Sequence, residues 1–429
     1  MFDFIYTIPT HRPIGEEFVN GFFKEVDYAN KTLKKNGALV IFEDNNEPIN
    51  KNVLTKYKQI YPDVQLFYIE KQRVFEFYDK IKNKLSDNDQ KVFEKLYPNK
   101  NVNYGNVFNR IFLFAQLFKA KVIIRRDSDC LIDNNGEFDV FPIKIELDRI
   151  GKQIEDKTVY IVGGGYKGKY NLDIDDLIKD GNDYTLVKEL FTCMSIPAEH
   201  HDDIIEEEIL GNNVDFVEDF IDNDSRAYPE CGNVSLYKLH EYLPAPSQDF
   251  ILGSDYFFID VAVHTKLNVT YHNRAVIHKH TSDRSASKEK VRNYWYGLMQ
   301  LIDSQIFYRH FYDSYLEKVN FNTYSKTQQV DYIVQNMQKA YQEFVQKFDD
   351  YREEKLSSLL NLLQKTTRPE IKNSILELTQ TKTQIYNITN VSILEHIKLI
   401  ETWQRVSNVI SQISVNYVSE VINKSKIEL

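Results

Sequence analysis

Short apolar runs alternate with amphipathic stretches along the first half of the chain. The runs at 2–8, 38–42 and 64–69 are rich in β-branched and aromatic residues, and they predict strands. Between them, apolar residues recur at helical spacing over 16–34, 74–85 and 106–119, which predicts three helices that each cover a sheet with one face. Such alternation of strand and helix favours parallel βαβ units.

The pattern continues with a predicted strand at 121–125, further strands at 159–162, 235–238, 256–261 and 275–278, and an acidic, helical stretch over 173–223. After Gly297 no glycine occurs, and Pro369 is the only proline in a region rich in Leu, Ile, Gln, Lys and Glu. Helices joined by short turns have this composition. We therefore expect an α/β domain over 1–285 and an all-α domain over 286–429.

Composition and charge narrow the function. Hydrophobic residues make up 42% of the 429 positions, and no apolar run reaches the ~20 residues that span a bilayer. The first residues lack a basic segment followed by an apolar one, so we expect no secretory signal and a cytoplasmic location. The net charge of −10 argues against nucleic-acid partners. Three scattered cysteines argue against a disulfide framework and a structural zinc site.

The strongest candidate chemistry is Arg125-Arg126-Asp127-Ser128-Asp129, directly after the strand at 121–125. Two carboxylates at i and i+2 after a strand can face one hard cation, Mg²⁺ or Mn²⁺, whose other ligands are usually phosphates and water. The spacing alone is a weak signal, because acidic pairs after strands are often solvated turns and because the same spacing recurs at 173–175 and 222–224.

The context of this motif carries a resemblance. The stretch from Gly105 through Asn109-Arg110 to Asp127-Ser128-Asp129 resembles the signature of metal-dependent, nucleotide-sugar glycosyltransferases of the GT-A type. The resemblance implies a Rossmann-type, mixed but mostly parallel sheet flanked by helices. It also implies that Asp127 and Asp129 hold the metal and the donor, with Asn109, Arg110 and Arg126 near the nucleotide or its phosphates. An ordinary helix cation remains the alternative for Arg110.

Two further strand ends fit this arrangement. The first predicted strand contains Thr7 and ends in Pro9-Thr10-His11-Arg12, and the next ends in Glu43-Asp44. Ligands of open α/β sheets bind at the carboxyl ends of strands. We therefore expect nucleotide contacts from the following residues, with plain polar turns as the alternative: Thr7, Pro9, Thr10, Arg12 and Asp44.

Two late segments complete the predicted site. Asp255, in Gly253-Ser254-Asp255, stands where inverting GT-A enzymes place a general base, although it could simply cap a helix. His280, with His278 as the alternative, is the histidine that the resemblance makes a further metal ligand. Both could instead be surface histidines. Lys279 and Arg284 could stabilise the charge of the departing diphosphate.

The functional prediction is a glycosyltransferase that uses a nucleotide-sugar donor, with a UDP-sugar favoured, and a hydroxyl acceptor on a small molecule, glycan or peptide. The sequence departs from the usual pattern in Arg125-Arg126 and in the order Asn109-Arg110. The order of motifs over 1–285 also resembles an uncharacterised bacterial domain family. The alternatives are a sugar-phosphate nucleotidyltransferase, whose glycine-rich loop is missing here, and a non-catalytic scaffold. The helical tail could mediate dimerisation or a protein contact.

Overall fold

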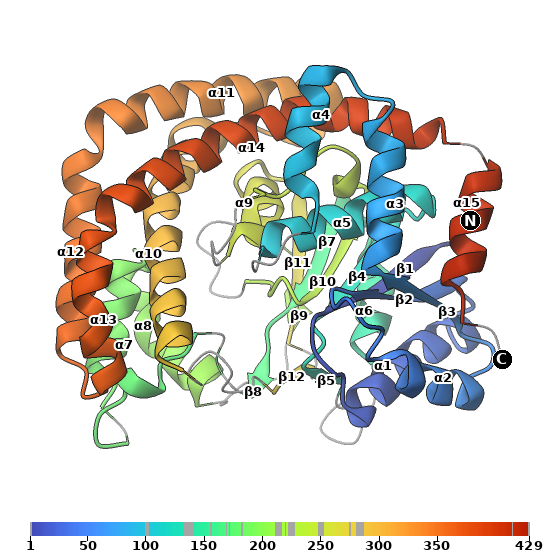
Figure 1. The fold of residues 1–429 in the computed structure, drawn as a ribbon, viewed down its shortest axis with the longest axis horizontal. Coiled ribbons are helices and arrows are strands. Elements are labelled where there is room, and N and C mark those ends of the chain that lie inside the picture. The colour runs from blue at the N-terminus through green and yellow to red at the C-terminus, as the bar shows by residue number, and fades with distance from the viewer. Residues whose placement is uncertain are drawn as a thin grey trace.

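The computed structural model describes residues 2–98, 103–132, 141–154, 157–168, 170, 172–181, 183–210, 217–218, 220–221, 228–247, 253–273, 276–279, 287–413 and 415–427. Within these ranges the fold is a mixed α/β sheet flanked by helices, followed by a helical C-terminal region (Figure 1). The predicted fold class is therefore confirmed. The division into domains at residue 286 stays a prediction.

The main sheet has the strand order β3-β2-β1-β4-β10-β7-β11-β9, with β6 paired to β7. Pairing is parallel from β3 to β4 and between β7 and β11, whereas β10 runs antiparallel to both of its neighbours and β9 antiparallel to β11. The strands are β1 (Phe4–Thr10), β2 (Gly37–Glu43), β3 (Gln65–Glu70), β4 (Val122–Arg126), β6 (Gln153–Ile154), β7 (Lys157–Gly164), β9 (Val217–Glu218), β10 (Asn233–Tyr237) and β11 (Asn268–His272).

Side chains of β1 and β2 alternate between two cores, as strand geometry requires. Ile5 and Val40 face one core with α3 (Lys71–Lys82), α5 (Tyr104–Leu117) and α9 (Phe257–His264). Tyr6 and Ile41 face the other, with α1 (Glu16–Lys31), α2 (Lys51–Ile60) and α6 (Pro142–Arg149). Both faces are covered, so β4 in the middle of the sheet is buried along its whole length.

A second, three-stranded sheet lies beside the carboxyl end of β4. Its order is β5 (Cys130–Ile132), β12 (Val276–His278) and β8 (Lys167–Gly168). Antiparallel pairing of β12 with β5 sets His278 opposite Cys130, one residue after Asp129. This small sheet therefore brings the late histidine segment to the end of the central strand.

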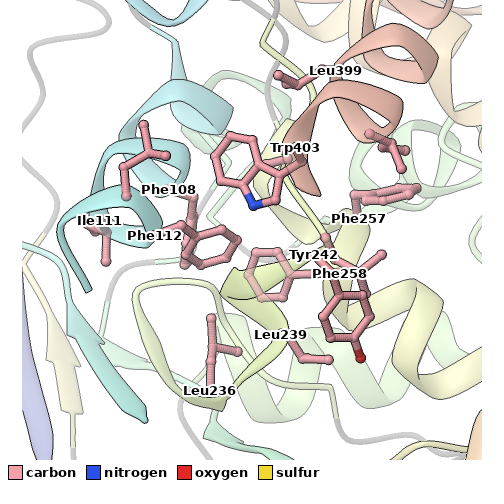
Figure 2. Packing of buried hydrophobic residues seen from close by; sticks show 14 of the residues in the cluster. Phe108, Ile111, Phe112, Leu236, Leu239, Tyr242, Phe257, Phe258, Leu399 and Trp403 are labelled. Carbon is pink, nitrogen blue, oxygen red and sulfur yellow. The ribbon is translucent and has the colours of Figure 1, made fainter. Parts of the chain in front are cut away.

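The C-terminal region contains α10 (Lys288–Phe311), α11 (Lys326–Lys347), α12 (Asp349–Gln364), α13 (Pro369–Gln380), α14 (Lys382–Ser411) and α15 (Val415–Ser425). Ser325 and Gln328 form a capping box at the start of α11. Helix α14 crosses over α4 (Asp87–Phe93) and α5 (Figure 1). Its Trp403 is fully buried beside Phe108 and Phe112, and its indole Nε1 donates to the carbonyl of His240 at 3.0 Å (Figure 2). The tail thus shares a core with the sheet.

The edge of β3 is partly covered by a later segment of the chain. Lys426 forms an antiparallel bridge with Phe67, and the amide of Ile427 donates to the carbonyl of Leu66 at 3.1 Å. The aromatic ring of Phe2 also contacts Phe67, with ring centroids 5.8 Å apart. Segments from both ends of the sequence therefore meet at one edge strand.

The sequence prediction of local structure is wrong at one segment and incomplete at another. The run predicted as a strand at 256–261 is helix α9, preceded by a short 3-10 turn over Ser254–Tyr256. Strand β11 was not predicted. The acidic stretch over 173–223 does contain helices in its described part, α7 (Thr185–Cys193) and α8 (His201–Ile204), and a π-helix over Ile205–Ile209. In the described part of the chain, no helix is both long and apolar enough to cross a membrane.

Candidate functional site

The loop after β4 is fixed by backbone hydrogen bonds from three directions. The amide of Asp127 donates to the carbonyl of Gly232 at 3.1 Å, and the amide of Lys279 donates to the carbonyl of Asp129 at 3.0 Å. The amide of Cys130 donates to the carbonyl of Asp127 at 3.0 Å, which closes a tight turn over the acidic motif. Asp127 and Asp129 therefore lie in a hydrogen-bonded turn at the carboxyl end of the central strand, and their role as ligands stays a prediction.

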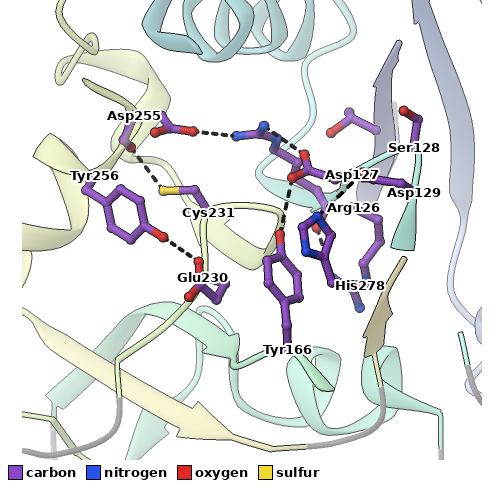
Figure 3. Close-up of polar contacts among 12 residues, drawn as sticks. Arg126, Asp127, Ser128, Asp129, Tyr166, Glu230, Cys231, Asp255, Tyr256 and His278 are labelled. Atoms are coloured by element: carbon purple, nitrogen blue, oxygen red, sulfur yellow. Dashed lines mark hydrogen bonds and ion pairs between the residues drawn. The ribbon is translucent and has the colours of Figure 1, made fainter. Parts of the chain in front are cut away.

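Asp127 is the more accessible of the two carboxylates, with 31% of its side chain exposed. Its Oδ1 accepts from Nη2 of Arg125 at 2.9 Å, and its Oδ2 accepts from the hydroxyl of Tyr166 at 3.2 Å (Figure 3). A Cβ placed on Gly232 would lie 1.9 Å from the Tyr166 hydroxyl and 2.2 Å from Oδ2 of Asp127. Only glycine at position 232 therefore leaves room for this pair.

Asp129 is buried and paired on two sides. Its Oδ2 lies 2.7 Å from Nη2 of Arg12 and 3.5 Å from Nε2 of His278. Burial raises the pKa of this carboxyl, but His278 and Arg12 outweigh burial and hold the pKa well below its usual value. Asp129 is therefore ionised across the ordinary pH range.

His278, the alternative histidine of the sequence prediction, lies in the site. Its ring stacks on Tyr166, with centroids 4.8 Å apart and planes inclined by 16°. Tyr166 in this way connects His278 to Asp127 (Figure 3). The preferred His280 and the predicted diphosphate ligand Arg284 lie outside the described residues. Lys279 is exposed, and its Nζ lies 3.7 Å from Glu17 of α1.

Asp255 lies across the site from Asp127 and is almost completely buried, with 8% of its side chain exposed. Its Oδ2 is 3.3 Å from Nη1 of Arg125, and its backbone carbonyl accepts from the thiol of Cys231 at 3.3 Å (Figure 3). Burial raises the pKa of Asp255, and the neighbouring Asp127 raises it further, whereas Arg125 lowers it. A carboxyl with a raised pKa near a cluster of acids is a common feature of catalytic sites.

Arg126, predicted near the donor, points away from these carboxylates into the core. Its guanidinium is fully buried between Glu25 and Glu146, at 3.3 and 2.9 Å, and His272 lies 3.3 Å from the other oxygen of Glu146. Burial raises the pKa of Glu25, whereas Arg126 and His272 overcome burial at Glu146 and lower its pKa to about 2. Arg126 thus anchors the base of the acidic loop, and its donor contact stays a prediction.

Polar groups lie at the ends of β1 and β2, and Arg12 connects them to the acidic loop. Nε of Arg12 donates to the hydroxyl of Ser128 at 3.3 Å, which places the end of β1 against the motif. Asp44, after β2, receives two hydrogen bonds from Arg110 of α5, one of them at 3.1 Å from Nη2. The amide of Asp44 also donates to the carbonyl of Thr10 at 2.8 Å. Four residues predicted to contact the nucleotide, Thr10, Arg12, Asp44 and Arg110, are therefore neighbours at the carboxyl ends of β1 and β2.

Other predicted nucleotide contacts have structural partners instead. The hydroxyl of Thr7 is buried and donates to the carbonyl of Ile124 at 3.0 Å. The amide side chain of Asn109 exchanges two hydrogen bonds of 2.8 Å with the backbone of Ala245. Pro9 is partly exposed within β1. The roles of these three residues at a nucleotide stay predictions.

The possible metal ligands at this site suit a hard divalent cation. Asp127 and Asp129 offer carboxylate oxygens and His278 an imidazole, which suit Mn²⁺ or Mg²⁺ with water and phosphates as further ligands. The set is not drawn together as tightly as a protein-only cage. Among the His, Cys, Asp and Glu side chains that the structure describes, one group of three places its possible ligand atoms within 4.8 Å of one another. This group is His264, Asp313 and Glu317.

Sequence reasoning missed the connecting residues of the site. Tyr166 and Gly232 do not figure in the sequence prediction, and Arg125 figures in it only as a departure from the usual pattern. Each owes its place to contacts with residues distant in sequence, and the local pattern gave only the glycines as a signal of close approach.

Comparison with known proteins gives a family and distant structural likenesses. No curated protein matches the sequence. A mannosyl-3-phosphoglycerate synthase from Rubrobacter xylanophilus is 10% identical over 71% of this chain and 74% of that chain, with a TM-score of 0.39. A mannosyltransferase from Pyrobaculum calidifontis, in complex with GDP-Man and Mn²⁺, is 9% identical over 93% and 87%, with a TM-score of 0.38. A mycobacterial protein is 8% identical over 70% and 75%, also at 0.38.

Likenesses at these scores carry no argument about the site. The family assignment rests on nearly the whole sequence, since the matching model covers residues 3–417, and the chain belongs to the family of unknown function DUF6271.

Proposed function

We propose that this protein is a metal-dependent glycosyltransferase of the GT-A type, which moves a sugar from a nucleotide-sugar donor to a hydroxyl group of an acceptor. A UDP-sugar is the favoured donor, and the acceptor is a small molecule, glycan or peptide. The observation that carries the proposal is the meeting of Asp127, Asp129 and buried Asp255 at the carboxyl end of the central strand.

The donor side of the proposal uses the acidic loop and the neighbouring strand ends. Asp127 and Asp129, with His278 or His280, would hold Mn²⁺ or Mg²⁺. Such an ion would stabilise the negative charge that develops on the diphosphate as the diphosphate leaves the sugar. Arg12 and Lys279 would add positive charge at the same end of the sheet, and Arg284 stays a candidate for the same task. Thr10, Asp44 and Arg110 would face the nucleoside, because they neighbour one another at the ends of β1 and β2.

The acceptor side of the proposal uses Asp255 as general base. Its carboxylate takes the proton of the acceptor hydroxyl, which requires a distance of about 2.6–3.2 Å. The acceptor oxygen then bonds to the anomeric carbon of the sugar. The bond from that carbon to the diphosphate breaks, and its electron pair leaves with the nucleoside diphosphate. A base on the side of the sugar opposite the diphosphate would invert the configuration.

Calorimetric titration with UDP, GDP and CDP, each with and without Mn²⁺, tests this proposal. We expect one nucleotide to bind in a metal-dependent manner, and the binding to be lost in Asp127→Asn and Asp129→Asn. Asp148→Asn, at an exposed pair with Lys144 on α6, is the matched control and should bind as the wild type does. Absence of nucleotide binding with and without Mn²⁺ would reject the enzyme and favour a scaffold.

A further inference from the structure

Arg125 is the one side chain that touches both Asp127 and Asp255 among the described contacts of the site. Its Nη2 lies 2.9 Å from Oδ1 of Asp127, and its Nη1 lies 3.3 Å from Oδ2 of Asp255 (Figure 3). The two carboxylates come from separate elements, the loop after β4 and the 3-10 turn before α9. One guanidinium therefore sets the spacing between a donor-side and an acceptor-side group.

The guanidinium has little freedom to move. It lies over the ring of Phe108, with its carbon 4.1 Å from the ring centroid, and 4% of the side chain is exposed. Its Nε is buried and has no hydrogen-bond partner among the described residues. A planar, rigid fork held on an aromatic face retains its geometry better than the flexible ammonium of lysine would.

Stability alone does not account for an arginine at this position. Arg125 is on the same side of β4 as Ile123, which packs in a core cluster with Phe108. An apolar residue would fit that surface, and replacing a buried ion pair with apolar groups is often neutral or stabilising. The arginine instead brings two like-charged carboxylates together, at a cost in desolvation.

We propose that Arg125 is a positioning residue that fixes Asp255 relative to Asp127, and thereby orients the acceptor base against the donor. The inference rests on the proposed function, because it assigns Arg125 a task within that reaction. Arg125 contacts no reacting atom in this scheme. Its effect passes through Asp255, and that dependence separates it from a residue that only stabilises the fold.

A double-mutant cycle tests the dependence. Arg125→Met, Asp255→Asn and the double variant are compared for release of nucleoside diphosphate from UDP-glucose or GDP-mannose, whichever the wild type hydrolyses. Binding of Mn²⁺ alone is measured by electron paramagnetic resonance. For Arg125→Met we expect kcat to fall by about 100-fold, as for a misplaced catalytic group, with little change in KM for the donor. In the Asp255→Asn background the same change should have no further effect.

Binding of Mn²⁺ gives a readout that is independent of turnover. Removal of a positive charge beside Asp127 should leave the Mn²⁺ affinity unchanged or increase it. Arg125→Lys keeps the charge but cannot form the same fork, so it should show the loss of kcat with a folded protein. Should Arg125→Met fail to fold, Arg125→Lys takes its place in the cycle. Arg405→Met, which removes a two-bond pair with Asp89 on α4, is the control and should leave kcat unchanged.

Additive losses in the cycle, wild-type kcat in both Arg125 variants, or a loss of Mn²⁺ affinity parallel to that of kcat would overturn the inference while leaving the proposed function intact. A wild type that binds neither Mn²⁺ nor any nucleotide would reject the proposed function, and the positioning role with it. The two failures are therefore distinguishable from the wild-type measurements.

Discussion

Replacement of Gly232 by alanine is a sharp steric test of the site, because it adds one methyl group and no charge. The new Cβ would lie 2.2 Å from Oδ2 of Asp127 and 1.9 Å from the hydroxyl of Tyr166, whereas real Cβ contacts stay beyond 3.0 Å. The Asp127 oxygen must therefore retreat by about 0.8 Å and the hydroxyl by about 1.1 Å. Both are side-chain ends, so they can move without unfolding the loop.

The expected effect is large on binding and turnover and small on stability. Displacement of a catalytic group by about 1 Å can cost about 100-fold in rate, or about 2.7 kcal/mol. The backbone of Gly232 is outside the left-handed region, so alanine brings no backbone strain there. The lower entropy of the unfolded chain should offset part of the crowding, and the free energy of unfolding should change by less than about 1 kcal/mol.

Three measurements on Gly232→Ala decide the matter: Mn²⁺ affinity, release of nucleoside diphosphate from the donor, and the free energy of unfolding in urea. Gly21→Ala is the control, because the added carbon meets Ile132 at 3.3 Å and no residue of the site. Wild-type Mn²⁺ affinity and turnover in Gly232→Ala would refute the reasoning that Asp127 and Tyr166 must keep their present positions.

Two further predictions concern stability. Arg352→Met should cost about 3–5 kcal/mol, because it leaves fully buried Asp303 unpaired after the loss of two 2.7 Å bonds, whereas Arg368→Met at the partly exposed pair with Asp176 should cost less than about 1 kcal/mol. Urea unfolding measures both, and equal costs would contradict the burial argument. Burial lowers the pKa of His396 to about 4, so the unfolded chain binds a proton there that the folded chain does not, and stability should fall as the pH drops from about 6.5 to 4. In His396→Gln the loss of unfolding free energy over that pH range should be smaller by up to about 3 kcal/mol. An unchanged loss would show that His396 does not contribute.

The sequence was sufficient for elements whose pattern is local. The strands at 38–42 and 64–69 and the helix at 106–119 correspond to β2, β3 and α5. The two strands are short apolar runs rich in β-branched and aromatic residues, and apolar residues recur at helical spacing in the helix, so each element can be recognised from its own residues. The run from Phe257 to Val263 is buried on nearly every side, so it shows no helical period and is easily mistaken for a strand. Strand β11 mixes polar and apolar residues that are all buried, and a pattern of alternating exposure does not reveal it.

The places of the candidate site residues in the fold were predictable to the same extent. The acidic pair at the end of β4 follows from its place after an apolar strand, as do the loops after β1 and β2. The pairing of Arg125 with Asp255 joins positions 130 residues apart, and no local pattern carries that information. The choice between His278 and His280 depends on strand register, which the sequence does not show. The pairing of β12 with β5 sets His278 opposite Cys130, next to Asp129.

The bridge between Lys426 and Phe67 has a practical consequence for handling the protein. An uncovered strand edge offers unpaired amide and carbonyl groups to the sheets of other molecules. A variant truncated after Ser425 would uncover the backbone of Leu66 and Phe67, which now pair with 426 and 427. Such a protein should keep the residues of the candidate site in place yet tend to self-associate and precipitate, so a loss of solubility after truncation should not be taken as a loss of function.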